Sequence, residues 1–315
     1  MRAYQTFRLQ IKFRHSAITP WQSDTIFGGF CWAYAYLRGE AALETMLADY
    51  AQGNPSVVFS AGFPGDLLPK PLFGLAPAPD PVREKRTMLN SFKEEKKIKK
   101  ITYLSIEEFQ QFQSGQTGKI APKENPLVVG EAFHNQIDRN SGTTAETGAL
   151  FSQSEWFSNC HFSVYLKIRE GFEEETRSTF EALGQIGLGK KRSLGRGGFD
   201  IMDFDLCHDF DSIHDPNAFV CLSNFVPAKD DPTEGYYNTM VKYGKTEFGP
   251  TGNPFKKPLI MLTPGAVFKL NGELKPFYGR MIQGLTNDNR VYHYGMAFAI
   301  PAKLNLSMEK EDHNA

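Results

Sequence analysis

The chain has 315 residues, of which 41% are hydrophobic and 13% aromatic, which is enough for one large domain or two ordinary ones. Its formal net charge of −1 excludes a polycation, so a nucleic-acid site would have to be a local patch. No run reaches the ~18–20 apolar residues that span a bilayer, the first residues contain no apolar signal-peptide core, and the four cysteines show no CxxC spacing. We therefore expect a cytoplasmic protein with no membrane contact, metal, cofactor or disulfide framework.

The first predicted elements are a strand and a helix. Apolar residues alternate over residues 4–13, as in a half-buried strand. Thr19-Pro20-Trp21-Gln22 has the pattern of a helix start, with Thr19 as N-cap and Gln22 closing a capping box. Helical spacing of apolar residues extends that helix to about Leu37. We assign three of its aromatic residues to the core, namely Trp21, Phe27 and Phe30.

The next segments alternate between regular elements and long loops. A helix is expected over 40–51, a buried strand over 57–61, a proline-rich loop over 64–81 and a small helix capped by Ser105 over 103–112. Eight Lys and Arg residues between 83 and 100 form a cationic region, which is either an interaction surface or a solvated helix face. A polar arm from His134 to Thr144 then leads into a strand near 150–157.

The last part of the first half contains the strongest periodic signals. A strand is predicted over 161–169, an amphipathic helix over 172–183 and a strand over 199–206. Together with the earlier elements this gives the order βαββαβ, the ferredoxin-like plan that the RNA-recognition motif shares. The predicted fold class is therefore α+β, with a ferredoxin-like domain over 1–210 that carries an insertion at about 62–155.

A second, less regular ferredoxin-like half is expected over 211–310. Its predicted elements are a strand over 219–225, a hairpin of 259–262 and 266–270 about Thr263-Pro264-Gly265, and a strand over 291–300. The charged residues 309–315 form a tail that we expect to be disordered.

A glycine-rich loop, residues 187–198, carries the clearest functional signal. Glycine allows positive φ and close approach of another chain, and Lys and Arg add positive charge, a combination that suits a phosphate-rich partner. His15 and Ser16, at the exit of the first strand, are expected on the same rim, and His134, Asn135 and Arg139 are expected on the arm, where Asp138 would hold Arg139. The candidate RNA-binding residues of the loop are Gly187, Gly189, Lys190, Lys191, Arg192, Ser193, Gly195, Arg196 and Gly197.

Two nucleotide-binding motifs fit the loop poorly. Gly184-x-x-x-x-Gly189-Lys190 is close to a P-loop, but Lys191 stands where a Ser or Thr would hold Mg²⁺. A P-loop joins a strand to a helix, whereas here a helix precedes and a strand follows, and a dinucleotide fingerprint fails for the same reason. A flexible surface loop with incidental charges stays open as an alternative to a polyanion site.

Four motifs in order resemble a known family. Gly187-x-Gly189-x-x-x-x-x-Gly195-x-Gly197 is similar to the glycine-rich loop of the CRISPR-associated RAMP superfamily. The other three narrow the resemblance to the type III-A (Csm) effector subunit that caps the crRNA 5′ handle: Ser16 to Gly28, His134-Asn135-x-Ile137-Asp138-Arg139-x-x-Gly142 and Tyr294-Gly295-x-Ala297-Phe298.

The resemblance implies a non-catalytic RNA-binding scaffold whose insertion forms a thumb. Such a subunit grips the crRNA 5′ handle, contacts the backbone RAMP subunit and the large polymerase-like subunit, and reaches target RNA near the guide 5′ end, while base pairing reads the sequence. One rival is a metal-independent crRNA-maturing endoribonuclease, with His15 or His134 as general base and Lys191 holding the developing charge. A RAMP subunit of another type III complex is a further alternative.

Overall fold

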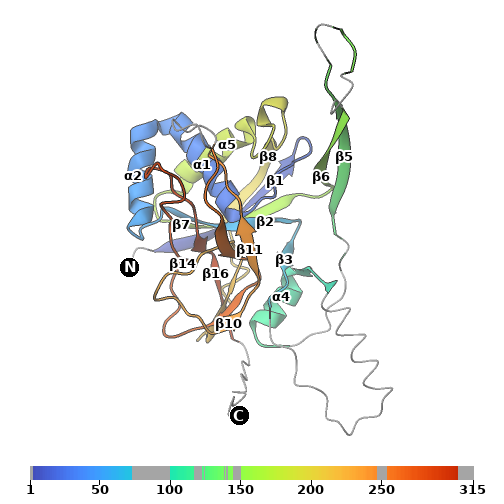
Figure 1. The fold of residues 1–315 in the computed structure, drawn as a ribbon. Helices are drawn as coiled ribbons and strands as arrows, with labels where there is room; N and C mark the ends of the chain where they lie inside the picture. Colours follow the sequence, from blue (N-terminus) through green and yellow to red (C-terminus); the bar gives the residue numbers. More distant parts are fainter. Residues whose placement is uncertain are drawn as a thin grey trace, which may run out of the picture.

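The first half of the chain forms a ferredoxin-like unit (Figure 1). The computed structural model describes residues 3–72, 100–116, 123, 125–137, 139, 141–144, 150–246 and 254–303. The sheet has the order β8–β1–β7–β2 with antiparallel neighbours, so its four strands follow the order fourth, first, third, second of a βαββαβ unit. The predicted plan is confirmed. Its elements are β1 (Tyr4–Phe13), α1 (Ser23–Arg38), β2 (Val57–Pro64), β7 (Phe162–Arg169), α5 (Glu173–Ile186) and β8 (Phe199–Leu206), with an additional helix α2 (Glu40–Ala51) after α1.

One face of this sheet is covered by α1 and α5. The ring of Phe59 on β2 lies 5.2 Å from that of Phe30 on α1 and 6.3 Å from that of Phe180 on α5. Trp21, Phe27 and Phe30 are all buried, as the sequence predicts. The apolar faces of the two helices and of the sheet therefore pack against each other in one aromatic layer.

The opposite face of the sheet is covered by the chain itself. Tyr165 on β7 stacks edge-on against Phe210, just beyond β8, with ring centroids 5.1 Å apart. Lys167 on the same face is half-buried and donates to the carbonyl oxygens of Pro276 and Ala299 in the second half, each at 2.7 Å. An RNA-recognition motif binds RNA on this sheet face, so RNA would have to bind this chain elsewhere.

The insertion between β2 and β7 contains a small hairpin-and-helix unit and a projecting arm. Ser105 caps α4 in a full capping box with Glu108, as predicted. The two-stranded β5–β6 hairpin, here called the thumb, projects well beyond the rest of the molecule (Figure 1). Some sequence predictions lie outside the described residues. These are residues 83–99 of the cationic region, Asp138 and the tail 309–315. The inserted elements are β3 (Leu67–Pro69), β4 (Tyr103–Ser105), α4 (Ile106–Gln113), β5 (Leu127–Asn135) and β6 (Leu150–Ser158).

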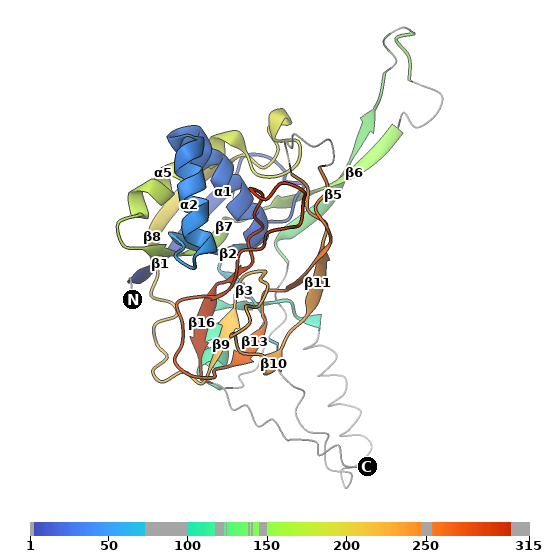
Figure 2. The same cartoon turned by 60° about the vertical axis from the view of Figure 1, so that its left-hand side comes forward.

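The second half repeats the strand order of the first without its helices in the described residues (Figure 2). Its main sheet has the order β16–β9–β13–β10. Counted along the chain, these are the fourth, first, third and second strands of the sheet, the same order as in the first half. This topology agrees with a second, less regular ferredoxin-like half. The strands of this half are β9 (Ala218–Cys221), β10 (Gly235–Tyr236), β11 (Thr239–Lys242), β12 (Leu259–Leu262), β13 (Val267–Lys269), β14 (Tyr278–Gly279), β15 (Met296–Ala297) and β16 (Ala299–Ala302).

The larger hydrophobic core contains residues of both halves, and the second half has a smaller cluster of its own. Successive residues of β9 point to opposite sheet faces, so Val220 packs in the core of the first half and Phe219 in a separate cluster of the second. Tyr294 is buried, stacks on Phe27 at 4.8 Å and accepts a hydrogen bond from the Phe59 backbone N–H at 2.9 Å. The Tyr294 motif therefore joins the halves.

Three local predictions are wrong. The expected strand over 291–300 is replaced by two short strands, β15 and β16, which pair with β14 and β9 respectively. The expected hairpin of 259–262 and 266–270 does not form, because β12 pairs with β11 whereas β13 pairs with β9 and β10. The turn at Gly265, with φ +91°, instead moves the chain from one sheet to another. Thr19 does not cap α1, which begins at Ser23 after Gln22, because Thr19 binds the glycine-rich loop instead.

Candidate nucleic-acid interface

The glycine-rich loop is anchored on helix α1. Gly187 ends α5 with φ +82°, and its N–H donates to the Leu183 carbonyl at 2.8 Å. The next residue, Leu188, is buried against Gly29 of α1, where a Cβ would overlap the leucine side chain. The helix glycine at 29 is therefore explained by the loop that sits on it.

All four glycines of the loop motif adopt positive φ, but they do so for different reasons. A Cβ on Gly197 would overlap the Leu188 carbonyl, and one on Gly189 would lie 2.6 Å from the Thr19 side chain. These glycines, like Gly187, let the loop fold onto its own chain. Gly195 differs, since among the described residues only His15 Cδ2 lies near, at 3.7 Å. Gly195 is thus the loop glycine that leaves room for a ligand backbone.

The cationic part of the loop faces solvent. Lys191 takes a left-handed conformation, φ 57°, and starts a 3₁₀ turn over Arg192–Leu194. Lys190, Ser193 and Gly195 are exposed, so the second half of the chain does not cover the loop. Of the cations predicted to contact phosphate, Lys190 is exposed, and Lys191, Arg192 and Arg196 are half-buried.

Arg196 and Ser16 are tied to the thumb. Arg196 forms an ion pair with Glu155 of β6 at 3.0 Å and donates to the Ser16 hydroxyl at 2.7 Å. Ser16 in turn donates to the other Glu155 oxygen at 2.5 Å, and Glu155 is only 3% exposed. These contacts hold the loop, the exit of β1 and the thumb in one geometry, which gives Arg196 and Ser16 a positioning role.

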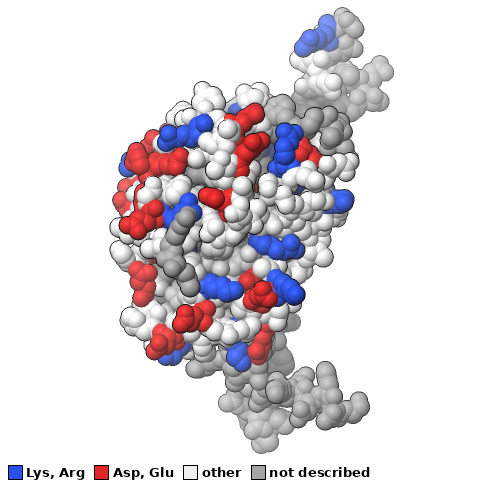
Figure 3. Space-filling model, turned by 90° about the vertical axis from the view of Figure 1, so that its left-hand side faces the viewer, with Lys and Arg blue, Asp and Glu red and all other residues white. Residues whose placement is uncertain are grey.

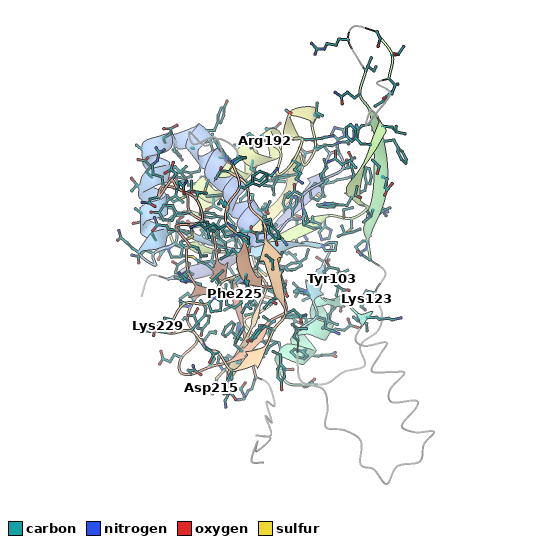
Figure 4. All side chains as sticks on the ribbon, in the orientation of Figure 1. Tyr103, Lys123, Arg192, Asp215, Phe225 and Lys229 are labelled. Carbon is teal, nitrogen blue, oxygen red and sulfur yellow. The ribbon has the colours of Figure 1, made fainter. Side chains whose placement is uncertain are left out.

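The loop and the side of the thumb also meet through an aromatic contact. The Lys191 ammonium lies 5.7 Å from the Phe151 ring centroid, and Phe151 stacks on His134 at 5.3 Å. Backbone hydrogen bonds between Ala17 and Trp156, at 2.8 and 2.9 Å, fix the thumb beside the exit of β1. Figure 4 shows Arg192 at the top of the molecule, close to α1 and on the side of the thumb. The structure therefore brings together most of the sequence-predicted residues.

The remaining predicted residues are arranged differently. His15 is exposed beside Gly195, whereas the Nε2 atom of His134 is buried without a hydrogen-bond partner in the described structure. Asn135 donates to Thr144 across the thumb at 2.8 Å. Arg139 is exposed in the turn beyond this contact, away from the glycine-rich loop. In this conformation the buried nitrogen of His134 would not reach a ribose hydroxyl.

Cations at this rim differ in how far carboxylates neutralise them. Arg14 pairs with Asp200, and Arg196 with Glu155. Within the described residues, no carboxylate forms an ion pair with Lys190 or Lys191. Their charge is therefore available to an external anion.

Other surfaces of the molecule are acidic. A groove of about 360 Å³ between α5 and the free edge of β8 is lined by four carboxylates, those of Glu181, Asp200, Asp203 and Asp205, against the single cation Arg177. Figure 3 shows the side of the molecule that lies to the left in Figure 1, where acidic side chains gather in the upper left and Lys and Arg are more frequent toward the right. These carboxylates would repel a polyanion.

Three residues of the site were not predicted from the sequence. Glu155 stands 41 positions before Arg196 in an otherwise ordinary strand, and nothing in its neighbourhood indicates a partner. Phe151 and Trp32 gave no signal either, because an aromatic residue in a strand or helix is more often buried. Only the fold shows that Trp32 is 44% exposed and lies under Arg192.

The repeated ferredoxin-like strand order, the glycine-rich loop after α5 and the inserted thumb define an α+β fold with two ferredoxin-like halves. Solved structures share it: a Csm1–Csm4 cassette in complex with AMPPNP has a TM-score of 0.62 at 18% identity, over 95% of this chain and 98% of the other. A Csm3–Csm4 subcomplex of the type III-A CRISPR-Cas interference complex has a TM-score of 0.60 at 17% identity, over 94% and 99%. Csm4 is common to both, and this chain has the Csm4 fold. No protein-family model and no curated protein matches the sequence.

No helix in the described part of the chain is long and apolar enough to cross a membrane.

Proposed function

We propose that this chain is the non-catalytic subunit of a type III-A CRISPR interference complex that binds the crRNA 5′ handle. The observation that carries the proposal is the solvent-facing Lys190-Lys191-Arg192 segment, held between α1 and the thumb with Gly195 open beside it. Single-stranded RNA bound there is recognised through its phosphates and by stacking. The shared fold supports contacts with a large subunit and a backbone RAMP subunit, as in the Csm1–Csm4 and Csm3–Csm4 structures.

The test is the affinity for an RNA with a repeat-derived 5′ handle, measured at several salt concentrations. Lys191→Ala combined with Arg192→Ala removes two phosphate contacts, so binding weakens and the salt slope, about 0.7 per contact on a single strand, decreases by about 1.4. Lys123→Ala with Lys229→Ala is the charge-matched control, because both lysines lie far from Arg192 (Figure 4). Wild-type affinity and slope in the loop variant would contradict the proposal.

The endoribonuclease alternative has a separate test. Repeat RNA is incubated with the purified chain in EDTA, and the products are separated on a denaturing gel. The proposal predicts intact RNA. Cleavage that is lost in His15→Ala or His134→Ala would instead assign a catalytic role to that histidine.

A further inference from the structure

We infer that the outer face of α1 continues the RNA path beyond the glycine-rich loop, with Trp32 and Tyr36 as stacking platforms for unpaired bases and Gly28 as the point where the RNA backbone approaches the helix. The inference rests on the proposed function. It extends the RNA-binding surface to the row of Gly28, Trp32 and Tyr36 on α1, which contains no basic residue. Three independent features of α1 carry it.

The first feature is the exposure of two aromatic rings on one ridge. Trp32 is 44% exposed and Tyr36 is 80% exposed, the highest value among the large hydrophobic residues of the described structure. Residues four apart on a helix lie on the same face, about 6 Å apart along its axis. Gly28, Trp32 and Tyr36 therefore form one row, and Trp32 in the middle of the row contacts the loop.

The second feature is the contact between this row and the glycine-rich loop. The Arg192 guanidinium lies over the Trp32 ring, 5.9 Å from its centroid. A phosphate held by Arg192 would place the adjoining base next to the indole. Stacking on aromatic faces combined with cations along the backbone is the usual way in which proteins hold single-stranded nucleic acid.

The third feature is a glycine that packing does not explain. Gly29 must lack a side chain because Leu188 occupies that space, but a Cβ on Gly28 would meet no atom of the described residues within 4 Å. Alanine would fit at Gly28 and would favour the helix. A glycine in mid-helix with open space above it suits close approach by another molecule.

Charge distinguishes RNA from an apolar protein surface as the occupant. The row contacts a cation of the loop at Trp32, and beyond Tyr36 it reaches α2, which carries Glu40, Glu44 and Asp49 and no Lys or Arg. A strand of RNA leaving Arg192 would thus follow α1 and stop before α2. Single-stranded RNA is the occupant that this pattern favours, and it is continuous with the proposed handle site.

The experiment titrates the synthetic handle RNA into the full chain and follows tryptophan fluorescence and affinity. Trp21 is buried, Trp156 is half-buried and Trp32 is exposed, so the part of the quenching that is lost in Trp32→Ala reports a base stacked on Trp32. Trp32→Ala is expected to lose most of the quenching and to bind roughly five- to a hundredfold more weakly, with an unchanged salt slope because no charge is removed. Trp32→Leu keeps apolar bulk without a ring face, and it is expected to be equally weak.

The glycine pair separates RNA contact from folding. Gly28→Ala is expected to raise the melting temperature and still weaken RNA binding, whereas Gly29→Ala lowers the melting temperature because it displaces Leu188. Wild-type affinity in both Trp32→Ala and Gly28→Ala, while the Lys191/Arg192 variant binds weakly, would overturn this inference and leave the proposed function standing. Wild-type RNA affinity together with loss of a co-expressed subunit in Trp32→Ala would overturn it in favour of a protein interface.

Discussion

At the scale of single residues, one buried histidine between the halves has a definite protonation state. His293 is 7% exposed and lies 3.6 Å from Asp24, which pairs with Lys242 at 2.7 Å. Burial is the largest cause and lowers the pKa of His293 to about 4; the nearby Asp24 carboxylate opposes this shift, and Lys256 and Lys242 add to it. The neutral imidazole is therefore part of the folded structure at pH 7.

This protonation state predicts a pH dependence of stability. The unfolded histidine has a pKa of 6.5, so between pH 6.5 and 4 the unfolded chain binds the extra proton. The contribution of His293 is complete above pH 6.5 and is lost as the pH falls toward 4, by about 3 kcal/mol in total. Urea unfolding of wild type and His293→Gln should show a shallower acid slope in the variant. Equal slopes between pH 6.5 and 4.5 would show that the site does not titrate in this way.

The residue types alone could not show which cations of the glycine-rich loop are available to bind RNA and which ones hold the loop against the thumb. Sequence patterns singled out the cations Lys191 and Arg196 equally, because both stand among glycines. The structure shows the first facing solvent beside Phe151 and the second held by Glu155. Their different roles depend on a strand distant in sequence, which local pattern does not report.

At the scale of elements, the orientation of the thumb depends on a buried ion pair. Glu155→Gln removes the charge that faces Arg196 and weakens the acceptor of Ser16. We expect a loss of about 2 kcal/mol in the free energy of unfolding, because one partner of a buried charged pair remains. RNA affinity should decrease as well, since the loop is no longer held against the thumb.

The control for this prediction is a similar pair at the surface. Asp200→Asn breaks the exposed Arg14–Asp200 pair, whose carboxylate is 61% exposed, and should change stability little. Thermal unfolding of both variants gives the comparison. If Glu155→Gln is as mild as Asp200→Asn, the buried pair does not fix the thumb.

Elements defined by strong periodicity were predicted well, and those defined by distant partners were not. The strands Tyr4–Phe13 and Phe199–Leu206 begin and end where alternation indicated. The start of α1 was misplaced because Thr19 binds the Lys190 N–H, and Ser23 instead donates to the Asn224 carbonyl at 2.9 Å. Both partners lie more than 170 residues away in sequence, so no local motif could indicate them.

At the scale of the whole molecule, the arrangement of the halves decides where RNA can bind. The order of helices and strands was sufficient to predict the first sheet, but not that its second face would be closed by Phe210 and by carbonyls that bind Lys167. The order of elements also did not predict that the chain passes from one sheet to another at Gly265, because strand pairing in the second half is set by the shared core. Because that sheet face is covered, the exposed cationic rim between the loop, α1 and the thumb remains as the candidate RNA-binding surface.

Photo-cross-linking tests the central claim most directly. Handle RNA with 4-thiouridine at each position is irradiated on the full chain, and cross-linked peptides are identified by mass spectrometry. The account predicts cross-links within residues 187–198, at Phe151 of the thumb and at Trp32 of α1. Cross-links confined to the acidic groove between α5 and β8, or to the second half, would contradict it.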